Sequence, residues 1–291
     1  MSDIGIISRK RSQLIPYQIA FAREGIPFFA DMDLQVLRTD AFKNVKKMLA
    51  IAGRAASTGF TETDPVDDVI ALCDRVRRYG LRVGDRQPLI RFLRSRSPRT
   101  LPEAVDALGE SQCPLTDAPE FLSAIRGLTL AESVADKIRA ISIGFEGLGK
   151  DYVKSRDDVF FADPPFIHLA EYALEYGDNL GDFYRDIQEA TANLALLPTD
   201  EEQVFENWKY RIQMMTALRA KGKEFDAVFI LDANDGTWPS SMADSEEQQE
   251  QERRLFYVAF TRTRNLLYIL TTEALHGEPA VPSPYLAEMG L

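Results

Sequence analysis

Short apolar runs alternate with amphipathic stretches over the first fifty residues. Residues 4–8 (IGIIS) and 26–30 (IPFFA) predict two buried strands. The helix between them is predicted to begin at Ser12, its N-cap, and to end before Gly25. A second helix is predicted over residues 40–52. The order strand, helix, strand, helix is typical of a parallel sheet.

This pattern stops at residues 53–65, where small, polar and Thr-rich sequence indicates a domain boundary. From there to residue 205 the periodicity is helical, with segments at 66–79, 89–94, 118–126, 131–141 and 179–197. Strand and helix signals then return as a strand at 227–231, a helix at 246–264 and a strand at 266–270. We therefore predict one α/β domain from residues 1–54 and 205–291, interrupted by an all-helical subdomain over 55–204.

Composition narrows the class of protein. Hydrophobic content of 45% and charged content of 27% are ordinary for a soluble globular protein. Neither a membrane-spanning apolar run nor a signal peptide is evident, so we expect a cytoplasmic protein without a membrane partner. Cys73 and Cys113 lie far apart and lack metal-ligand spacing, which predicts no disulfide and no metal site. The net charge of −11 argues against nucleic acid over the whole surface and leaves room for a local basic strip.

Two segments in the C-terminal part of the chain contain residues that could bind phosphate. Before the strand at 227–231, Lys221 offers an ammonium, Gly222 permits close backbone approach and Glu224 can accept from a sugar hydroxyl. In open α/β sheets such ligands bind at the carboxyl ends of strands and at helix N-termini. On the following helix, Arg262 lies near the edge of the buried face, where it can meet phosphate charge. The alternatives are an ordinary Lys-Gly turn and an arginine that only covers apolar surface.

Further cations occur within the helical subdomain. Nine arginines fall between residues 75 and 99 with Asp85 as the sole acid, and we expect Arg91, Arg94 and Arg96 to contact a DNA backbone. The alternative is a solvated helix face. Residues 144–151 (GFEGLGKD) approximate a phosphate loop, but an Asp replaces the required Ser/Thr, so we reject that assignment. Gly147, Gly149 and Lys150 instead resemble the glycine turn of a helix-hairpin-helix, which grips a duplex phosphate; a plain interhelical loop is the alternative.

Segments near both ends of the chain resemble the motifs of a known protein family. TALRAKGKEFDAVFI with DGTWP, and QERRLFYVAFTRTRNLLYI, resemble motifs V and VI of the Rep/UvrD/PcrA superfamily 1 DNA helicases. Residues 5–52 resemble the stretch after motif IV of that family, and PSPYLAEM is similar to its tail. The resemblance implies the second RecA-like motor domain, a parallel-sheet fold of the P-loop NTPase type, with a mobile insert that contacts duplex DNA.

Individual roles follow from the resemblance by position. Arg262 matches the motif VI arginine that reaches the ATP γ-phosphate from the opposite motor domain, and Glu224 matches the glutamate near the nucleotide sugar. Lys221 and Gly222 belong to the same pocket. Thr216, Arg9 and Arg11 match positions that touch single-stranded DNA. The pair Arg253 and Arg254 opens motif VI, and Trp238 is expected to anchor a packed loop or to stack on a base.

The chain also departs from the family pattern. Leu218 stands where the family usually has His, and Lys223 replaces the usual Leu, which puts DNA coupling in doubt. The phosphate loop G-x-x-x-x-G-K-S/T and an acidic Mg²⁺ motif are missing. We therefore expect the C-terminal half of an ATP-dependent 3′→5′ DNA helicase, inactive as an ATPase alone, which uses ATP and Mg²⁺ together with an N-terminal motor domain. The rivals are a non-enzymatic DNA-binding or adaptor protein and a partner-binding scaffold.

Overall fold

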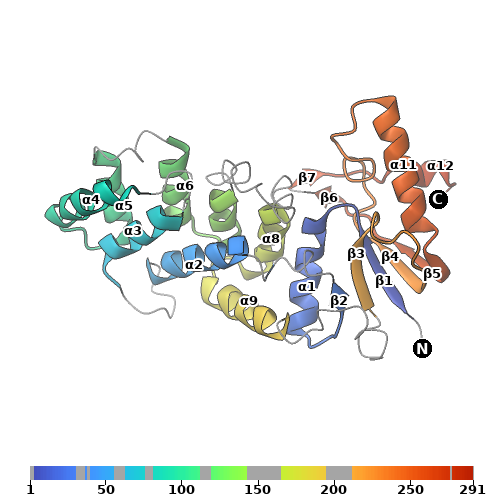
Figure 1. The fold of residues 1–291 in the computed structure, drawn as a ribbon, viewed down its shortest axis with the longest axis horizontal. Coiled ribbons are helices and arrows are strands. Elements are labelled where there is room, and N and C mark those ends of the chain that lie inside the picture. Colours follow the sequence, from blue (N-terminus) through green and yellow to red (C-terminus); the bar gives the residue numbers. More distant parts are fainter. Residues whose placement is uncertain are drawn as a thin grey trace. The chain divides into compact units, whose positions relative to one another are not determined.

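Two compact units make up the protein, which is represented by a computed structural model (Figure 1). The structure describes residues 3–30, 37, 40–55, 63–75, 81–111, 119–142, 165–194, 212–275 and 277–290. The first unit combines Met1–Val36 with Ala190–Leu291, and the second is Leu37–Glu189. These divisions differ from the boundaries at 54 and 205 that the sequence indicated, since the helix that starts at residue 40 belongs to the second unit. The functional assignment of the domains stays a prediction.

A five-stranded parallel sheet forms the core of the first unit. Its spatial order is β2-β3-β1-β4-β5, and every neighbouring pair is parallel. The strands are β1 (Ile4–Ser8), β2 (Phe29–Ala30), β3 (Ile212–Thr216), β4 (Phe225–Ile230) and β5 (Thr263–Ile269). The predicted α/β class is confirmed. The central strand β1 pairs Ile4 with both Ile212 and Ala227, so the two ends of the chain build one sheet.

Two helices connect these strands in opposite directions along the sheet. Helix α1 (Leu14–Arg23) leads from β1 toward β2, and α11 (Glu246–Phe260) leads from β4 to β5. Because parallel crossovers are right-handed, the two helices cover opposite faces. The predicted cap at Ser12 was wrong: Ser12 lies in the short helix η1 (Arg11–Gln13), and the buried Gln13 is the N-cap of α1.

The ends of α1 and α11 can also be compared with the predicted ones. Gly25 follows α1 with φ of 66°, a left-handed conformation that favours glycine, so its predicted role as terminator is confirmed. Helix α11 ends at Phe260 rather than at 264, because the chain turns there to start β5. This unit also contains a hairpin of β6 (Ala274–Leu275) and β7 (Glu278–Pro279) and the helix α12 (Pro284–Glu288).

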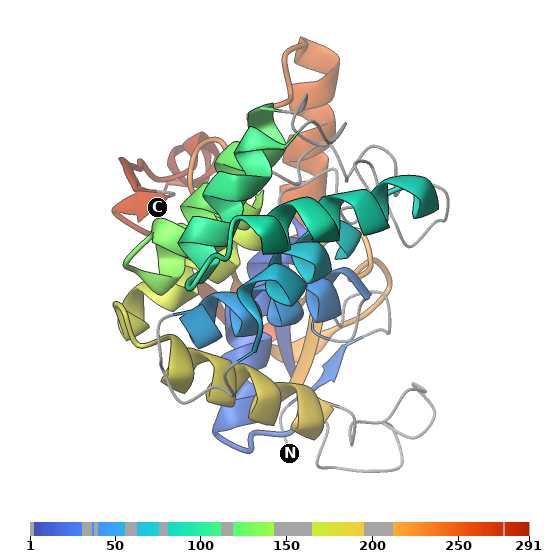
Figure 2. The same ribbon diagram turned by 90° about the vertical axis from the view of Figure 1, so that its left-hand side faces the viewer.

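The described part of the second unit is helical and contains no strand, which confirms that expectation for these residues (Figure 2). Its helices are α2 (Asp40–Ala55), α3 (Pro65–Arg75), α4 (Val83–Ser95), α5 (Leu101–Glu110), α6 (Pro119–Leu130), a helix over residues 134–142, α8 (Pro165–Ala173), η6 (Leu174–Tyr176) and α9 (Leu180–Leu194), which runs into the first unit. Val69, Leu93 and Leu108 are fully buried in this bundle. No described helix of either unit combines the length and apolarity that crossing a membrane would need.

Candidate functional site

Arg262 lies where α11 ends and β5 begins. Its Nε donates to the Val258 carbonyl at 2.9 Å, and its Nη2 donates to the Thr261 hydroxyl at 2.9 Å. Its Nη1 donates to the Lys223 carbonyl at 3.2 Å. The guanidinium therefore caps the C-terminal end of α11, where a cation is favourable against the helix dipole. It also ties that end to the turn before β4.

The turn before β4 comprises residues 221–224 and approaches the same arginine from the other side. Gly222 has φ of 85°, so glycine suits this position, and both Lys221 and Gly222 are exposed. The amide of Phe225 donates to the Arg262 carbonyl at 2.8 Å. The structure thus joins Arg262 to the turn that contains Lys221 and Gly222, although the two segments are some forty residues apart in sequence.

Glu224 has a partner that the sequence did not single out. Its carboxylate accepts from Arg264 Nε at 3.2 Å, and Arg264 Nη1 lies 3.7 Å from Asp226. Arg264 follows Arg262 by two residues, but nothing in the spacing indicated that it would turn toward Glu224. The assembled cluster therefore holds Arg262 and Arg264 with the carboxylates of Glu224 and Asp226, and Lys221 lies two residues before the carbonyl that Arg262 contacts.

This cluster lies at the amino-terminal ends of β4 and β5. The general rule for open α/β sheets had predicted ligand binding at the carboxyl ends of the strands instead. The position differs because residues 217–224 carry the chain back from the end of β3 to the start of β4. The candidate nucleotide residues therefore lie at the amino edge of the sheet, not at its carboxyl edge.

The residues predicted to touch single-stranded DNA lie at that carboxyl edge. Thr216 ends β3 opposite Ser8, and Arg9 follows directly after β1. Given the rise per strand residue, this edge is roughly 17–20 Å from the Arg262 cluster along the strands. Arg11 is partly buried in η1 at the same edge. Contact with DNA stays a prediction for Thr216, Arg9 and Arg11.

Arg9 is engaged within the protein. Its Nε donates to Glu252 Oε2 at 2.7 Å, and its Nη2 contacts the second oxygen of the same carboxylate. Glu252 is buried on α11 and also accepts from the Ser240 amide at 3.3 Å. This bidentate pair joins the end of β1 to α11 and to the loop that precedes it.

A second bridge crosses the same edge. Asp232, two residues after the end of β4, has φ of 48°, and its carboxylate accepts from the Gln13 side-chain amide. Burial raises the pKa of Tyr17 to about 12, and the negative charge of Asp232 adds to the rise. Sequence reasoning missed Gln13, Tyr17 and Asp232, because their proximity depends on which strands become neighbours.

Residues 167–274 match the family model of the UvrD-like helicase C-terminal domain. The matched segment includes β3, the 221–224 turn, β4, α11, Arg262 and β5. This part of the chain is similar to the C-terminal region of UvrD-type helicases. The family's RecA-like architecture agrees with the parallel sheet of the first unit.

Curated relatives of this UvrD-type region are helicases. DNA helicase II of Escherichia coli (strain K12) is 37% identical over 100 residues, 33% of this chain and 14% of the relative. The ATP-dependent DNA helicase PcrA of Staphylococcus epidermidis (strain ATCC 12228 / FDA PCI 1200) is 39% identical over 85 residues, 27% of this chain and 12% of the relative. A probable DNA helicase II homolog of Mycoplasma genitalium is 30% identical over 112 residues, 37% of this chain and 16% of the relative. The matched length is thus a small part of each relative.

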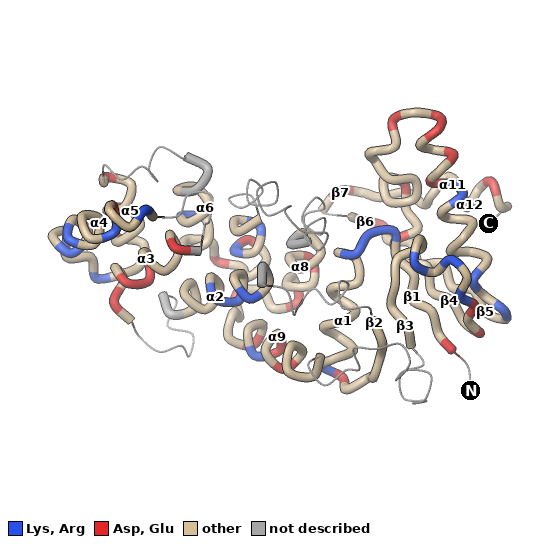
Figure 3. The backbone as a smooth tube through the Cα atoms, viewed as in Figure 1, with Lys and Arg blue, Asp and Glu red and all other residues tan. Residues whose placement is uncertain are grey.

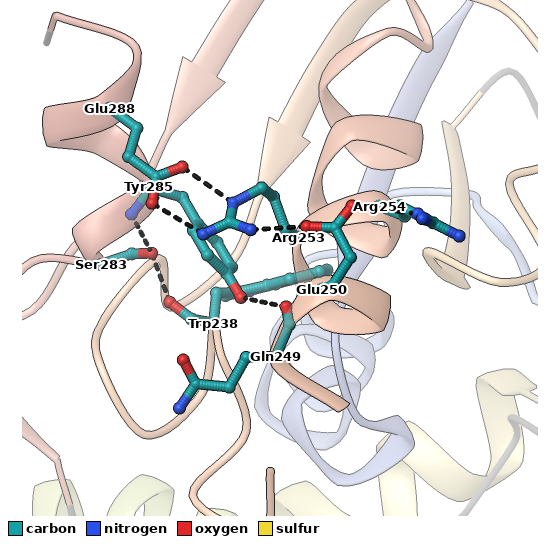
Figure 4. A network of polar contacts seen from close by, with 8 residues as sticks. All are labelled: Trp238, Gln249, Glu250, Arg253, Arg254, Ser283, Tyr285 and Glu288. Carbon is teal, nitrogen blue, oxygen red and sulfur yellow. Dashed lines mark hydrogen bonds and ion pairs between the residues drawn. The ribbon is translucent and has the colours of Figure 1, made fainter. Parts of the chain in front are cut away.

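The loop of the UvrD-type region between β4 and α11 is anchored by Trp238. This side chain is fully buried, and its Nε1 donates to the Leu231 carbonyl at 3.1 Å. The Ser283 hydroxyl donates to the Trp238 carbonyl (Figure 4). The expectation of a packed loop anchor is confirmed, and stacking on a base is wrong for this conformation because the ring is covered.

The arginine pair of α11 faces solvent beside α12. Arg253 Nε donates to Glu288 at 2.9 Å and its Nη1 donates to Glu250 at 2.6 Å, so the guanidinium links α11 to α12 (Figure 4). Hydrogen bonds from Arg253 and then Arg254 hold the pKa of Glu250 below its usual value. These contacts stabilise α11, the helix that ends just before Arg262.

The basic segment of the insert is only partly described. Arg94 Nη2 lies 3.5 Å from Asp67 on α3, and Arg96 Nη2 lies 3.0 Å from Glu110 on α5. Arg91 is exposed and has no ion-pair partner among the described residues. Gly147, Gly149 and Lys150 lie outside the described residues, so their predicted turn stays a prediction. In the part of the chain that the structure describes, no three His, Cys, Asp or Glu residues gather to hold a metal ion.

Proposed function

We propose that this chain supplies the C-terminal motor region of an ATP-dependent DNA helicase. In this proposal the first unit acts as the second RecA-like domain, and the second unit forms an insert that contacts the duplex at its junction with single-stranded DNA. The 3′→5′ polarity and the cytoplasmic location follow from the resemblance and the composition. The observation that carries the proposal is the bond from Arg262 to the Lys223 carbonyl, which assembles motifs V and VI into one cluster.

The chemistry of this cluster fits the polyphosphate of ATP. Lys221 supplies a point charge, Gly222 leaves the backbone open to a phosphate oxygen, and Glu224 is exposed to accept from a sugar hydroxyl. A guanidinium carries more N–H donors than the three acceptors that Arg262 contacts. Arg262 can therefore bind phosphate charge while it remains fixed to α11.

The partner in this proposal is an N-terminal motor domain. ATP bound there supplies the phosphoryl group, and we assign Mg²⁺ to that domain because the resemblance places the acidic metal ligand in it. Arg262 would stabilise charge on the phosphoryl oxygens during transfer, as arginine fingers do. Thr216 and the cations at the carboxyl edge of the sheet would hold the single strand.

The test compares the isolated chain with a protein that joins it to a first motor domain carrying G-x-x-x-x-G-K-S/T. The isolated chain should show no ATP turnover, and robust turnover abolished by Arg262→Ala would overturn the proposal. In the joined protein Arg262→Lys should lower kcat about a thousandfold, because the planar fork of donors is lost. Arg254→Lys, on the preceding helix α11 and exposed, is the matched control.

A rival function is a non-enzymatic DNA-binding or adaptor protein. Leu218, where the family usually has His, is 72% exposed and offers neither donor nor acceptor to couple DNA to nucleotide. If the joined protein binds single-stranded DNA yet never hydrolyses ATP in response, the adaptor is favoured.

A further inference from the structure

Strand β5 is irregular where it begins, at the amino edge of the sheet. Its register pairs Phe225 with Thr263. The next printed pair joins Ala227 to Leu266, so two steps along β4 match three steps along β5. The Thr263 hydroxyl donates to the Leu266 carbonyl at 2.7 Å across this β-bulge. Bulges redirect the side chains of a strand and are frequent next to active sites, and Arg264 lies within this one.

From the bulge, the Arg264 guanidinium contacts two carboxylates. Its Nε donates to Glu224 at 3.2 Å, and its Nη1 lies 3.7 Å from Asp226. Figure 3 shows basic and acidic residues close together around β4 and β5. The side chains of Arg264 and Glu224 are 52% and 62% exposed, and ion pairs as exposed as this one contribute little to stability. Stability therefore does not explain why an arginine is turned toward Glu224.

The backbone of Glu224 is fixed to Arg262 on both sides. The carbonyl of Lys223, which precedes it, accepts from Arg262 Nη1 at 3.2 Å. The amide of Phe225, which follows it, donates to the Arg262 carbonyl at 2.8 Å. An exposed glutamate side chain still samples several rotamers when its backbone is fixed. The contact with Arg264 limits this sampling, so it gives the carboxylate a preferred direction.

We propose that Arg264 is a positioning residue for nucleotide binding, which orients the Glu224 carboxylate toward a hydroxyl of the ATP sugar. This inference rests on the proposed function, in which Glu224 accepts from that hydroxyl, and it adds Arg264 to the site. A carboxylate offers about four acceptor positions on its two oxygens, so the bond to Arg264 leaves Glu224 able to accept from the sugar. Arg264 acts on the nucleotide only through Glu224.

The experiment uses the protein that joins this chain to a first motor domain, and it measures steady-state ATP hydrolysis. Arg264→Met should raise the KM for ATP about 3- to 10-fold and leave kcat within about twofold, because a hydrogen bond to bound ATP is weakened. Arg264→Lys keeps a cation beside Glu224 and should recover most of the KM. The control Arg23→Met removes an Nε contact of the same 3.2 Å, to Glu24 at the end of α1, and should change neither constant.

Two further measurements separate positioning from a general effect on the fold. In a Glu224→Ala background, Arg264→Met should have no additional effect on KM, because the carboxylate through which it acts is gone. With the wild type, 2′-deoxy-ATP or 3′-deoxy-ATP should have a higher KM than ATP. Arg264→Met should remove most of that difference. Melting curves should be the same for all these variants, because both side chains are exposed.

The outcomes distinguish this inference from the proposed function. An unchanged KM in Arg264→Met overturns the inference, and so do additive effects of Arg264→Met and Glu224→Ala. Equal KM values for ATP and both deoxy analogues in the wild type overturn it as well. Each of these results leaves the proposed motor function intact, since the joined protein still hydrolyses ATP. A joined protein without ATP turnover overturns the proposed function and this inference with it.

Discussion

At the scale of single residues, polar side chains from distant parts of the chain pair with one another at the carboxyl edge of the sheet. Gln13 reaches Asp232, and Arg9 reaches Glu252, across more than two hundred residues. Removing one member of a buried ion pair is more costly than removing both, because the remaining charge is left without a partner. These pairs therefore tie the segment that follows β1 to α11 and to the chain after β4.

Tyr17 gives this edge a measurable pH dependence. Burial and the neighbouring Asp232 raise its pKa from 10.0 to about 12, so the folded protein retains the phenolic proton longer than the unfolded chain does. The free energy of unfolding should consequently be unaffected below pH 10 and fall by up to about 2 kcal/mol as the pH rises from 10 to 12. Urea unfolding of the wild type and of Tyr17→Phe across this window is the measurement. Equal slopes for the two proteins would contradict the prediction.

At the scale of elements, sequence periodicity identified most of what the structure contains. Strands β1, β4 and β5 were predicted from their apolar runs, which suit strands buried on both faces. Strands β1 and β4 are largely buried, whereas β5 is largely exposed. Strand β3 was missed, since Gln213, Met214 and Met215 have weak strand preference and gain it only by pairing with β1. Helix α5, whose N-cap Thr100 accepts from the Glu103 amide, was also missed.

The candidate site was predictable in a different way. The resemblance identified Arg262 and the 221–224 turn, but neither periodicity nor motif spacing could tell that Glu224 would pair with Arg264. The same limit applies to α4, where a row of arginines in sequence becomes two groups only when α3 and α5 supply carboxylates. Pairing of charges depends on tertiary neighbours, which a single sequence does not specify.

Lys137 shows how one side chain stabilises the end of a helix. It is buried, and its ammonium donates to the Leu128 carbonyl at 3.3 Å and to the Ala131 carbonyl, at the C-terminal end of α6. Burial lowers the pKa of Lys137, yet the carbonyls need this donor. Lys137→Met should destabilise the protein by about 1–3 kcal/mol, as measured by urea unfolding. The control Arg139→Met, which removes an exposed pair with Asp136, should cost less than about 0.5 kcal/mol.

At the scale of the whole molecule, one compact unit is continuous in sequence and the other is not. The first unit needs Met1–Val36 because β1 lies between β3 and β4. A fragment of residues 190–291 should therefore lack a stable sheet, whereas residues 37–189 should fold alone with a helical circular-dichroism spectrum. Adding a peptide of residues 1–36 should restore strand signal to the first fragment. A cooperative melt of 190–291 without the peptide would show that β1 is dispensable.

The position of β1 in the sequence also means that it is synthesised long before the strands with which it pairs. Ile4 leaves the ribosome about two hundred residues before its partner Ile212 exists. At roughly 5–20 residues per second, β1 waits on the order of ten to forty seconds with its edges unpaired. During that interval the helical unit can complete its own local contacts, which form faster than long-range strand pairing. The nascent chain is thus exposed at β1 during this interval, and a chaperone that binds short apolar segments would find its target at Ile4–Ser8.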